Sequence, residues 1–323
     1  FDPVKFDADE IALLAKDGGM RSIVFTSKHH DGFCMFGTET TTYSSVAKMP
    51  SHRDFVREMS EACARHGLRF GLYYSLIDWN YPHAYPISSH NADFVTPEHH
   101  EFSKAQVREL LTNYGPVSEL WFDMGSLEPW QSRELYDLVK ELQPDCMVSG
   151  RLGNDVYDFA VMADNKLPES ALHAPWQSAA SMFPETWSYR SWQKRGSVDD
   201  KVAEKLRSLI KVVSHGGNYL LNIGPASDGS IVPFEREVLL KIGSWLEENG
   251  VEYDEEIVIQ RQIFLDGKNV CRVNGTPVSV SILRKLGIQL INIHGQHDSA
   301  SLFDEENHLQ FLDSFADNEA LRQ

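Results

Sequence analysis

The sequence predicts an α/β protein whose main part is a (β/α)8-type, TIM-like barrel, followed by a small α+β segment. Two observations predict this fold. Short apolar stretches alternate four times in succession with helical stretches across short loops, which is typical of βα units and a parallel sheet. A doubly wound open sheet would normally carry a glycine-rich phosphate loop after its first strand, and the sequence contains no GxGxxG or GxxxxGK[ST] motif. The barrel is therefore favoured over the open sheet.

The first half of the chain supplies the alternating units. Gly18-Gly19 ends the first predicted helix and Gly67 ends the second, as glycines at helix C-termini commonly do. The predicted helices cover residues 6–19, 54–66, 97–114 and 134–142, and the predicted strands cover residues 21–26, 68–75, 119–123 and 147–151.

After Arg151 the pattern loosens into an aromatic-rich loop region and then resumes with a helix over 201–214, a strand over 219–225 and a helix over 234–249. The character of the sequence changes after Gly250. Hairpin-like strands follow, with Asp-Gly and Asn-Gly pairs that favour tight turns. The sequence therefore predicts two domains, residues 1–250 and residues 251–323.

Composition limits the classes of ligand. A net charge of -17 would repel a phosphate backbone, so nucleic acid is not the expected partner of the barrel. No run of about 18 apolar residues predicts a transmembrane helix, and no signal peptide is visible. The cysteines are scattered without CxxC spacing, which predicts neither a zinc site nor a dense disulfide framework.

One strand end predicts the centre of the site. The apolar run of residues 119–122 leads directly into Asp123, and Gly125 then lets the backbone turn. In parallel α/β folds the C-terminal ends of the strands are where ligands bind and chemistry occurs. An Asp in this position could instead cap the following helix. Because three other strand ends also carry polar and aromatic residues, Asp123 is the expected nucleophile.

The other strand ends suit a neutral, polyhydroxylated ligand such as a sugar. Aromatic rings can stack on the C–H faces of a sugar, while His, Arg and carboxylates bind its hydroxyl groups. Each ring taken singly could equally belong to the core. A metal site at His29-His30 is not expected, because neighbouring strand residues point to opposite faces and rarely bind one ion. The residues gathered at these strand ends are His29, His30, Tyr73, Tyr74, Asp78, Trp79, Trp121 and Arg151.

Four ordered stretches carry a resemblance to the family 29 α-L-fucosidases. They are residues 27–33 (SKHHDGF), 71–75 (GLYYS), 120–123 (LWFD) and 217–225 (GNYLLNIGP). The resemblance covers about residues 1–250 and implies a (β/α)8-like catalytic barrel and a retaining mechanism. It implies that Asp123 is the nucleophile and that the fucose hydroxyls are bound by His29, His30, Tyr74, Trp121 and Arg151. It implies no cofactor, and its substrate would be a fucosylated oligosaccharide or glycoconjugate.

A retaining glycosidase also needs a second carboxyl, roughly 5–5.5 Å from the first, as acid and then base. Residues 158–164 occupy the region where the family resemblance leads us to expect a Gly-Asp-Phe…Glu pattern, and the Glu is shifted or absent. Asp164 is the first candidate for the acid/base, followed by Glu169 and Glu185. Any of the three could instead be a solvated surface charge.

The resemblance also predicts what the chain lacks. The family's first barrel strand, with a sugar-binding His, is expected before Phe1, and its C-terminal β-sandwich is expected after Gly250. A barrel without one strand has two unpaired edges. The family resemblance also favours a periplasmic or secreted location.

The tail resembles a different family. Residues 253–256, 266–275 and 291–298 are similar to the head region of the bacterial DNA repair ATPase RecN, in which Gln296 would be the Q-loop residue. Walker A, signature and Walker B motifs are absent, so no catalysis is expected of the tail. A chimera joined near Gly250 is one interpretation, and a divergent accessory region is the other.

Three functions follow from these observations. The first is a retaining exo-α-L-fucosidase. The second is a non-catalytic barrel that binds fucose or another carbohydrate, because the acid/base residue is not placed by a motif. The third and weakest is a DNA-repair ATPase fragment, against which the negative charge and the missing nucleotide motifs both count.

Overall fold

The computed structural model describes residues 2–88, 91–166 and 174–249, together with three short strands between residues 259 and 279. The chain divides into two compact units, Phe1–Gly250 and Val251–Gln323, which are described separately. Among the described residues, no helix combines the length and the hydrophobicity that a membrane span requires.

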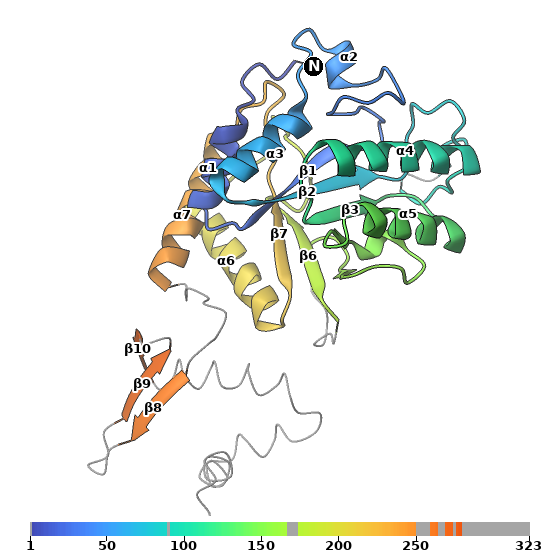
Figure 1. The fold of residues 1–323 in the computed structure, drawn as a ribbon. Helices are drawn as coiled ribbons and strands as arrows, with labels where there is room; N and C mark the ends of the chain where they lie inside the picture. The colour runs from blue at the N-terminus through green and yellow to red at the C-terminus, as the bar shows by residue number, and fades with distance from the viewer. Residues whose placement is uncertain are drawn as a thin grey trace, which may run out of the picture. The chain divides into compact units, whose positions relative to one another are not determined.

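The first unit contains two parallel sheets whose strands follow chain order (Figure 1). One sheet is β1 (Ser22–Lys28), β2 (Arg69–Ser75), β3 (Glu119–Asp123) and β4 (Met147–Val148), and the other is β5 (Ala160–Val161), β6 (Trp176–Ser181) and β7 (Asn218–Asn222). A parallel bridge between Ser149 and Phe159 links the two sheets between β4 and β5. Sequential, parallel, neighbouring strands are the order of a barrel-type fold.

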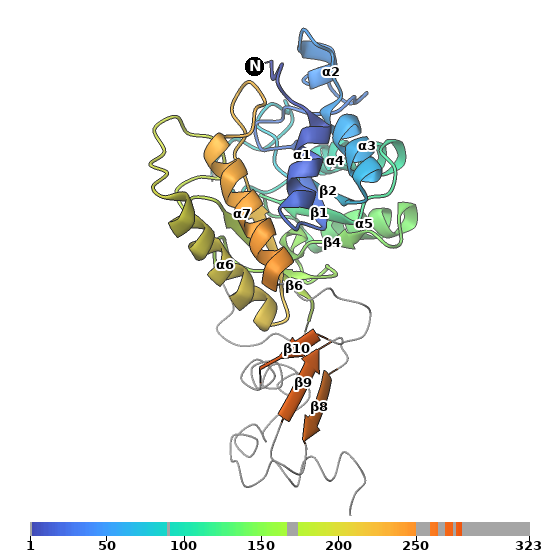
Figure 2. The ribbon, with the colours of Figure 1, turned by 90° about the vertical axis from the view of Figure 1, so that its left-hand side faces the viewer.

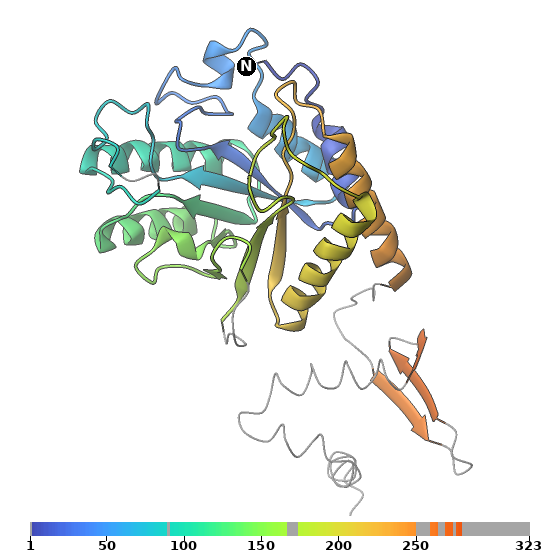
Figure 3. The same cartoon turned by 180° about the vertical axis from the view of Figure 1, so that it is seen from behind.

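The helices lie outside these strands (Figures 1 and 3). They are α1 (Ala8–Asp17), α2 (Ser45–Lys48), α3 (Phe55–His66), α4 (Pro97–Asn113), α5 (Pro129–Leu142), α6 (Val198–Ser214) and α7 (Pro233–Asn249). Side-chain caps fix several of their starts: Asp7 accepts a hydrogen bond from the Glu10 amide, and Asp54 accepts one from the Arg57 amide. The third helix ends at Gly67, whose φ of 72° is in the left-handed region.

Helices α1 and α7 contact each other, although β1 and β7 belong to different sheets. Helix α1 contacts both α3 and α7 and lies between them (Figure 2). A Cβ on Gly243 of α7 would lie 1.8 Å from the Asp17 carbonyl oxygen, so only glycine permits this close approach. Within the described residues no strand pairs β1 with β7. The expected parallel α/β architecture is therefore present, while closure of a (β/α)8 barrel is not shown.

Two apolar clusters hold this unit together. The larger contains the outward-facing residues of the first sheet and the residues of α3, α4 and α5 that cover it, including Leu72, Leu120, Phe122, Met59 and Leu110. The smaller cluster is centred on α6 and α7. The first cluster fixes the strands whose C-terminal ends carry the predicted site.

The structure departs from the predicted elements at several places near the site. Helix α5 begins at Pro129 rather than at 134, because a proline suits the first turn and Glu128 and Gln131 form a capping box. The predicted strand over 147–151 ends at Val148, and a 3-10 turn, η1 (Gly150–Leu152), follows. Strands β5 and β6 occupy a region that the sequence pattern assigned to loops.

The second unit contains an antiparallel sheet in the order β10 (Thr276–Val278), β9 (Asn269–Val273) and β8 (Ile259–Ile263). Antiparallel pairing of these strands is what the hairpin-like pattern predicts. Gln296 lies outside the described residues.

Candidate active site

The parallel register brings the predicted site residues to one end of the first sheet. Tyr73 of β2 lies opposite Trp121 of β3, and Ser75 lies opposite Asp123. His29 and His30 follow directly after β1, and Arg151 lies in η1 directly after β4. Side chains from four consecutive strand ends therefore meet at the C-terminal edge of the sheet, where parallel α/β folds bind ligands.

These strand ends carry a row of rings that ends on a guanidinium. His30 and His29 have ring centroids 4.1 Å apart, and His29 stacks on Tyr73 at 5.6 Å. Tyr73 stacks on Trp121 at 6.1 Å, and the Cζ of Arg151 lies 5.1 Å from the Trp121 ring centre. The row forms a continuous aromatic and cationic wall beside Asp123.

Asp123 is held at two points. The Tyr73 hydroxyl donates a hydrogen bond to Oδ2 at 2.7 Å, and Arg151 Nη1 donates one to Oδ1 at 2.9 Å. The Asp123 side chain is 13% exposed. Burial, together with the charge of Asp123 and the hydrogen bond to it, raises the pKa of Tyr73, so the hydroxyl remains a donor throughout the ordinary pH range. Both carboxylate oxygens are therefore fixed, which orients this group.

Arg151 joins Asp123 to the predicted acid/base. Its Nη2 donates to Asp164 and to the Met162 carbonyl oxygen. The Asp164 side chain is 46% exposed and lies in the segment after β5. Burial lowers the pKa of Arg151, but the hydrogen bonds and charges of Asp164 and Asp123 raise it more, and the net shift is upward. One guanidinium thus holds both predicted carboxylates on the same side of the sheet.

Tyr74 does not join this group, and a direct contact with a sugar is not supported for it. Its side chain is fully buried on the other face of β2, where the hydroxyl accepts from Lys28 Nζ at 3.0 Å and donates to Gln106 at 2.7 Å. Neighbouring strand residues point to opposite faces, so only one of Tyr73 and Tyr74 can reach the site. Tyr73 is the one whose hydroxyl contacts Asp123.

A buried polar chain supports Trp121 from inside the unit. The indole Nε1 donates to Gln177 Oε1 at 2.6 Å, and Gln177 Nε2 donates to Glu119 at 3.1 Å. Burial raises the pKa of Glu119. Gln177 belongs to β6, a strand that the sequence pattern did not predict, so this support was missed.

A large cavity opens at the same strand ends. Its lining includes His29, His30, Tyr73, Trp121, Asp123, Arg151, Asp164 and Glu185. Its volume of about 1980 Å³ exceeds the roughly 300–1,000 Å³ of most ligand pockets. Residues of both β1 and β7 also line it, so the cavity extends from the first sheet to the second. Glu185 lies exposed at this cavity, and Glu169 lies outside the described residues.

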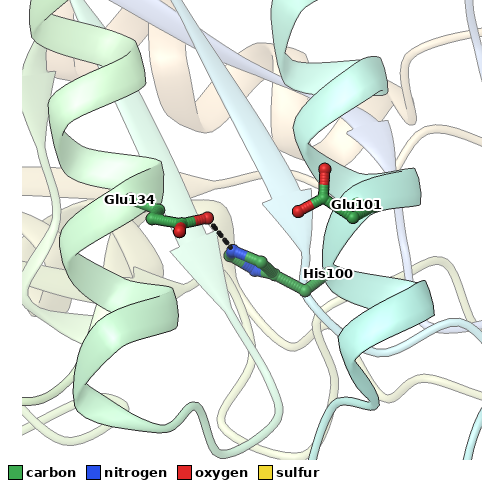
Figure 4. Close-up of side chains that lie close together, drawn as sticks. All are labelled: His100, Glu101 and Glu134. Atoms are coloured by element: carbon green, nitrogen blue, oxygen red, sulfur yellow. Dashed lines mark hydrogen bonds and ion pairs between the residues drawn. The ribbon is translucent and has the colours of Figure 1, made fainter.

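One group of described residues could hold a cation, and it lies away from this cavity. His100 and Glu101 of α4 and Glu134 of α5 place their ligand atoms within 4.8 Å of one another (Figure 4). Lys104 Nζ contacts Glu101 at 2.9 Å and Glu134 at 2.8 Å, so an ammonium group already pairs with both carboxylates. His29 and His30 are not part of the group.

A strand-end carboxylate fixed by a tyrosine and an arginine, beside a wall of rings, is an arrangement suited to a glycosidase. Comparison with known proteins gives the family. Residues 1–251 match the family model described as α-L-fucosidase. The chain belongs to the α-L-fucosidase family.

Curated relatives and solved structures agree with this assignment. Over 76% of this chain, the mouse tissue α-L-fucosidase is 32% identical and the human plasma α-L-fucosidase is 32% identical, covering 56% and 54% of those proteins. The chain thus spans about half the length of these curated relatives.

Two solved structures show how much of the fold is shared. An α-L-fucosidase from Lactobacillus casei, in complex with α-L-fucose product, is 32% identical with a TM-score of 0.65 and covers 77% of this chain and 81% of its own. The α-L-fucosidase isoenzyme 1 from Paenibacillus thiaminolyticus is 29% identical with a TM-score of 0.71. The match covers 86% of this chain and 79% of that protein's chain.

Proposed function

We propose that residues 1–250 hydrolyse terminal α-L-fucose from fucosylated oligosaccharides or glycoconjugates, with retention of configuration at the anomeric carbon. The observation that carries this proposal is Asp123, fixed between Tyr73 and Arg151 at the end of β3 in a chain of the α-L-fucosidase family. A closed (β/α)8-type barrel remains part of the proposal.

Asp123 acts as the nucleophile. Its carboxylate attacks the anomeric carbon, the bond to the leaving oxygen breaks, and a covalent fucosyl-enzyme forms. Water then attacks the same carbon, and Asp123 is released as a carboxylate. The Tyr73 hydroxyl and the Arg151 guanidinium orient the carboxylate and stabilise its charge when the intermediate breaks down.

Asp164 supplies and removes the proton. It protonates the leaving oxygen in the first step and takes a proton from water in the second. Arg151 Nη2 occupies Asp164 Oδ1 in the structure, so Asp164 must leave Arg151 before this oxygen can reach the leaving group. Its exposure, in a segment outside the strands, leaves room for this movement.

The sugar lies against the ring row. His29 and His30 bind fucose hydroxyl groups, Trp121 stacks against the sugar, and Arg151 contributes hydrogen bonds when Asp164 releases it. Tyr73, rather than the predicted Tyr74, lies beside the sugar. No cofactor enters this chemistry.

The rival function is fucose binding without turnover, and the Arg151–Asp164 ion pair is the observation that favours it. Incubation with 4-nitrophenyl α-L-fucopyranoside, followed by NMR of the first anomer released, separates the two. Hydrolysis with α-L-fucose as the first product supports the proposal, and loss of turnover in Asp123→Ala ties it to this site. Binding of fucose without hydrolysis supports the rival, and first release of the β-anomer contradicts the retaining mechanism.

The identity of residues 251–323 stays a separate hypothesis. An artefactual chimeric junction near Gly250 would be contradicted by natively produced protein whose peptide map contains one continuous peptide across Gly250, and residues 251–323 would then be a divergent accessory region. A periplasmic or secreted location is likewise inferred from the family and is tested by fractionation of cells that produce the native protein.

A further inference from the structure

A buried ion pair lies directly behind the ring row and has no part in the proposed reaction. Lys28, the last residue of β1, has a side chain with no exposed surface. Its Nζ lies 3.3 Å from Asp78 Oδ2 and 3.0 Å from the Tyr74 hydroxyl. The Asp78 side chain is 3% exposed. Removing two charges from water is costly, and a buried pair is often no more stabilising than apolar residues of the same volume.

The Lys28–Asp78 ion pair connects the turn after β1, which carries His29 and His30, to the turn after β2, which carries Trp79. Lys28 directly precedes His29. Asp78 follows β2 and accepts a hydrogen bond from the Asn80 amide at 2.9 Å. The Trp79 amide donates to the His30 carbonyl oxygen at 2.8 Å, and the Trp79 ring lies 4.0 Å from the His30 ring. Fixing Asp78 therefore fixes Trp79, which in turn packs on His30.

A glycine shows how closely the two turns fit. Gly32 has a φ of 82°, and a Cβ built there would lie 2.1 Å from Asp78 Oδ1. The carboxylate thus packs against the backbone that follows His29 and His30. On the other side, Tyr74 donates to Gln106 of α4, whose Nε2 donates to Thr40 at 2.9 Å. The pair is anchored to the helix layer as well as to both turns.

We propose that Lys28 and Asp78 are positioning residues that aim His29 and His30 at the sugar by locking the turn after β1 to the turn after β2. Neither residue touches the substrate. The inference rests on the proposed function, because it assigns His29 and His30 to sugar binding.

Three variants test it: Lys28→Met, Asp78→Asn and the double variant. Each single change leaves one buried partner unpaired, so we expect a lower Tm together with a KM for 4-nitrophenyl α-L-fucopyranoside raised by about 10- to 100-fold, as misplacement of binding groups does. We expect kcat, measured per active site, to change less than KM. The double variant removes both charges, so Tm returns toward that of the unaltered protein while KM stays raised.

Lys140→Met is the matched control, since Lys140 pairs with Asp158 at 2.7 Å away from the ring row. We expect Lys140→Met to lower Tm and to leave KM unchanged. A purely structural role for Lys28 and Asp78 predicts the same behaviour in their single variants, or a double variant in which KM recovers together with Tm. Either result overturns the inference.

Calorimetric titration with L-fucose separates this inference from the proposed function. If the unaltered protein binds fucose without hydrolysing the fucoside, the proposed hydrolysis fails, and weaker fucose binding in the single and double variants still supports the positioning role. Unchanged fucose binding in those variants overturns the positioning role. An unaltered protein that neither binds fucose nor hydrolyses the fucoside overturns both.

Discussion

The two carboxylates that share Arg151 are held in different ways. Asp123 ends a buried strand, is 13% exposed, and is fixed by both Tyr73 and Arg151. Asp164 lies in the segment after a two-residue strand, is 46% exposed, and is held by Arg151. The difference matches the two proposed roles. A nucleophile must be aligned with one carbon atom, whereas an acid/base must exchange a proton and return.

The largest loss of activity should follow substitution of Asp123, the carboxylate that is held at both oxygens. Asp123→Asn removes the nucleophile with little change in shape, and we expect kcat to fall by about 10⁴- to 10⁶-fold, as loss of a covalent nucleophile does. Steady-state hydrolysis of an aryl fucoside measures this. Asp137→Asn, on the exposed surface of α5, should stay within twofold of the unaltered protein. A comparable loss in that control would mean that Asp123→Asn reports general damage.

The more exposed carboxylate, Asp164, should show an effect that depends on the leaving group. Asp164→Asn removes the proton donor, and we expect hydrolysis of a fucosylated glycan to fall by about 10²- to 10⁴-fold. An aryl fucoside with an acidic phenol needs little protonation, so its first step should change far less. Parallel assays of the two substrates measure the ratio.

Glu185→Gln is the matched variant for this test, because Glu185 lines the same cavity. We expect it to retain the leaving-group dependence of the unaltered protein. If Glu185→Gln shows the selective loss and Asp164→Asn does not, then Glu185 is the acid/base and Asp164 is not.

Substitution of Arg151, which contacts both carboxylates, should reduce activity less than loss of either carboxylate. Arg151→Lys keeps the positive charge but cannot hold both groups with one planar guanidinium. We expect kcat/KM to fall by about 10- to 100-fold, the range set by loss of a hydrogen bond to a charged group. A change of less than twofold in kcat/KM would show that the bridge seen here has no part in turnover.

The smallest effect should come from the hydroxyl that orients Asp123. Tyr73→Phe removes the 2.7 Å hydrogen bond, and we expect kcat/KM to fall by about tenfold. The pKa of Tyr73 is raised, so the tyrosine stays protonated at any working pH, and the alkaline limb of the pH profile should not move in the variant. Tyr136→Phe loses a 2.9 Å bond to Asp158 outside the site and should leave kcat/KM unchanged. An alkaline limb that disappears with Tyr73 would contradict its role as a permanent donor.

The position of Asp123 could be predicted from a sequence pattern, and the position of Asp164 could not. An apolar run ending in one charge is a local pattern, and it predicted β3 and the position of Asp123. The segment that holds Asp164 has no such pattern, so its residue was chosen only by family resemblance. Contact with Arg151 is a property of the folded chain, since 13 residues separate the two in sequence.

The remaining misses also have physical reasons. All six residues of β6 are buried, and Ser178, Ala179, Ala180 and Ser181 give it neither alternation nor β-branched bulk, so it lacked the usual signal of a strand. For Tyr73 and Tyr74, alternation predicts opposite faces but not which face is the site. The register with β3, which sets Tyr73 opposite Trp121, decides it.

The most direct measurement is covalent trapping with 2-fluoro-fucosyl fluoride, followed by mass spectrometry of the digested protein. We expect one fucosyl adduct on the peptide that contains Asp123, and no adduct in Asp123→Asn. An adduct on another carboxylate would contradict the assignment of Asp123. Turnover of fucosides with no adduct formed under any condition would contradict the covalent, retaining mechanism itself.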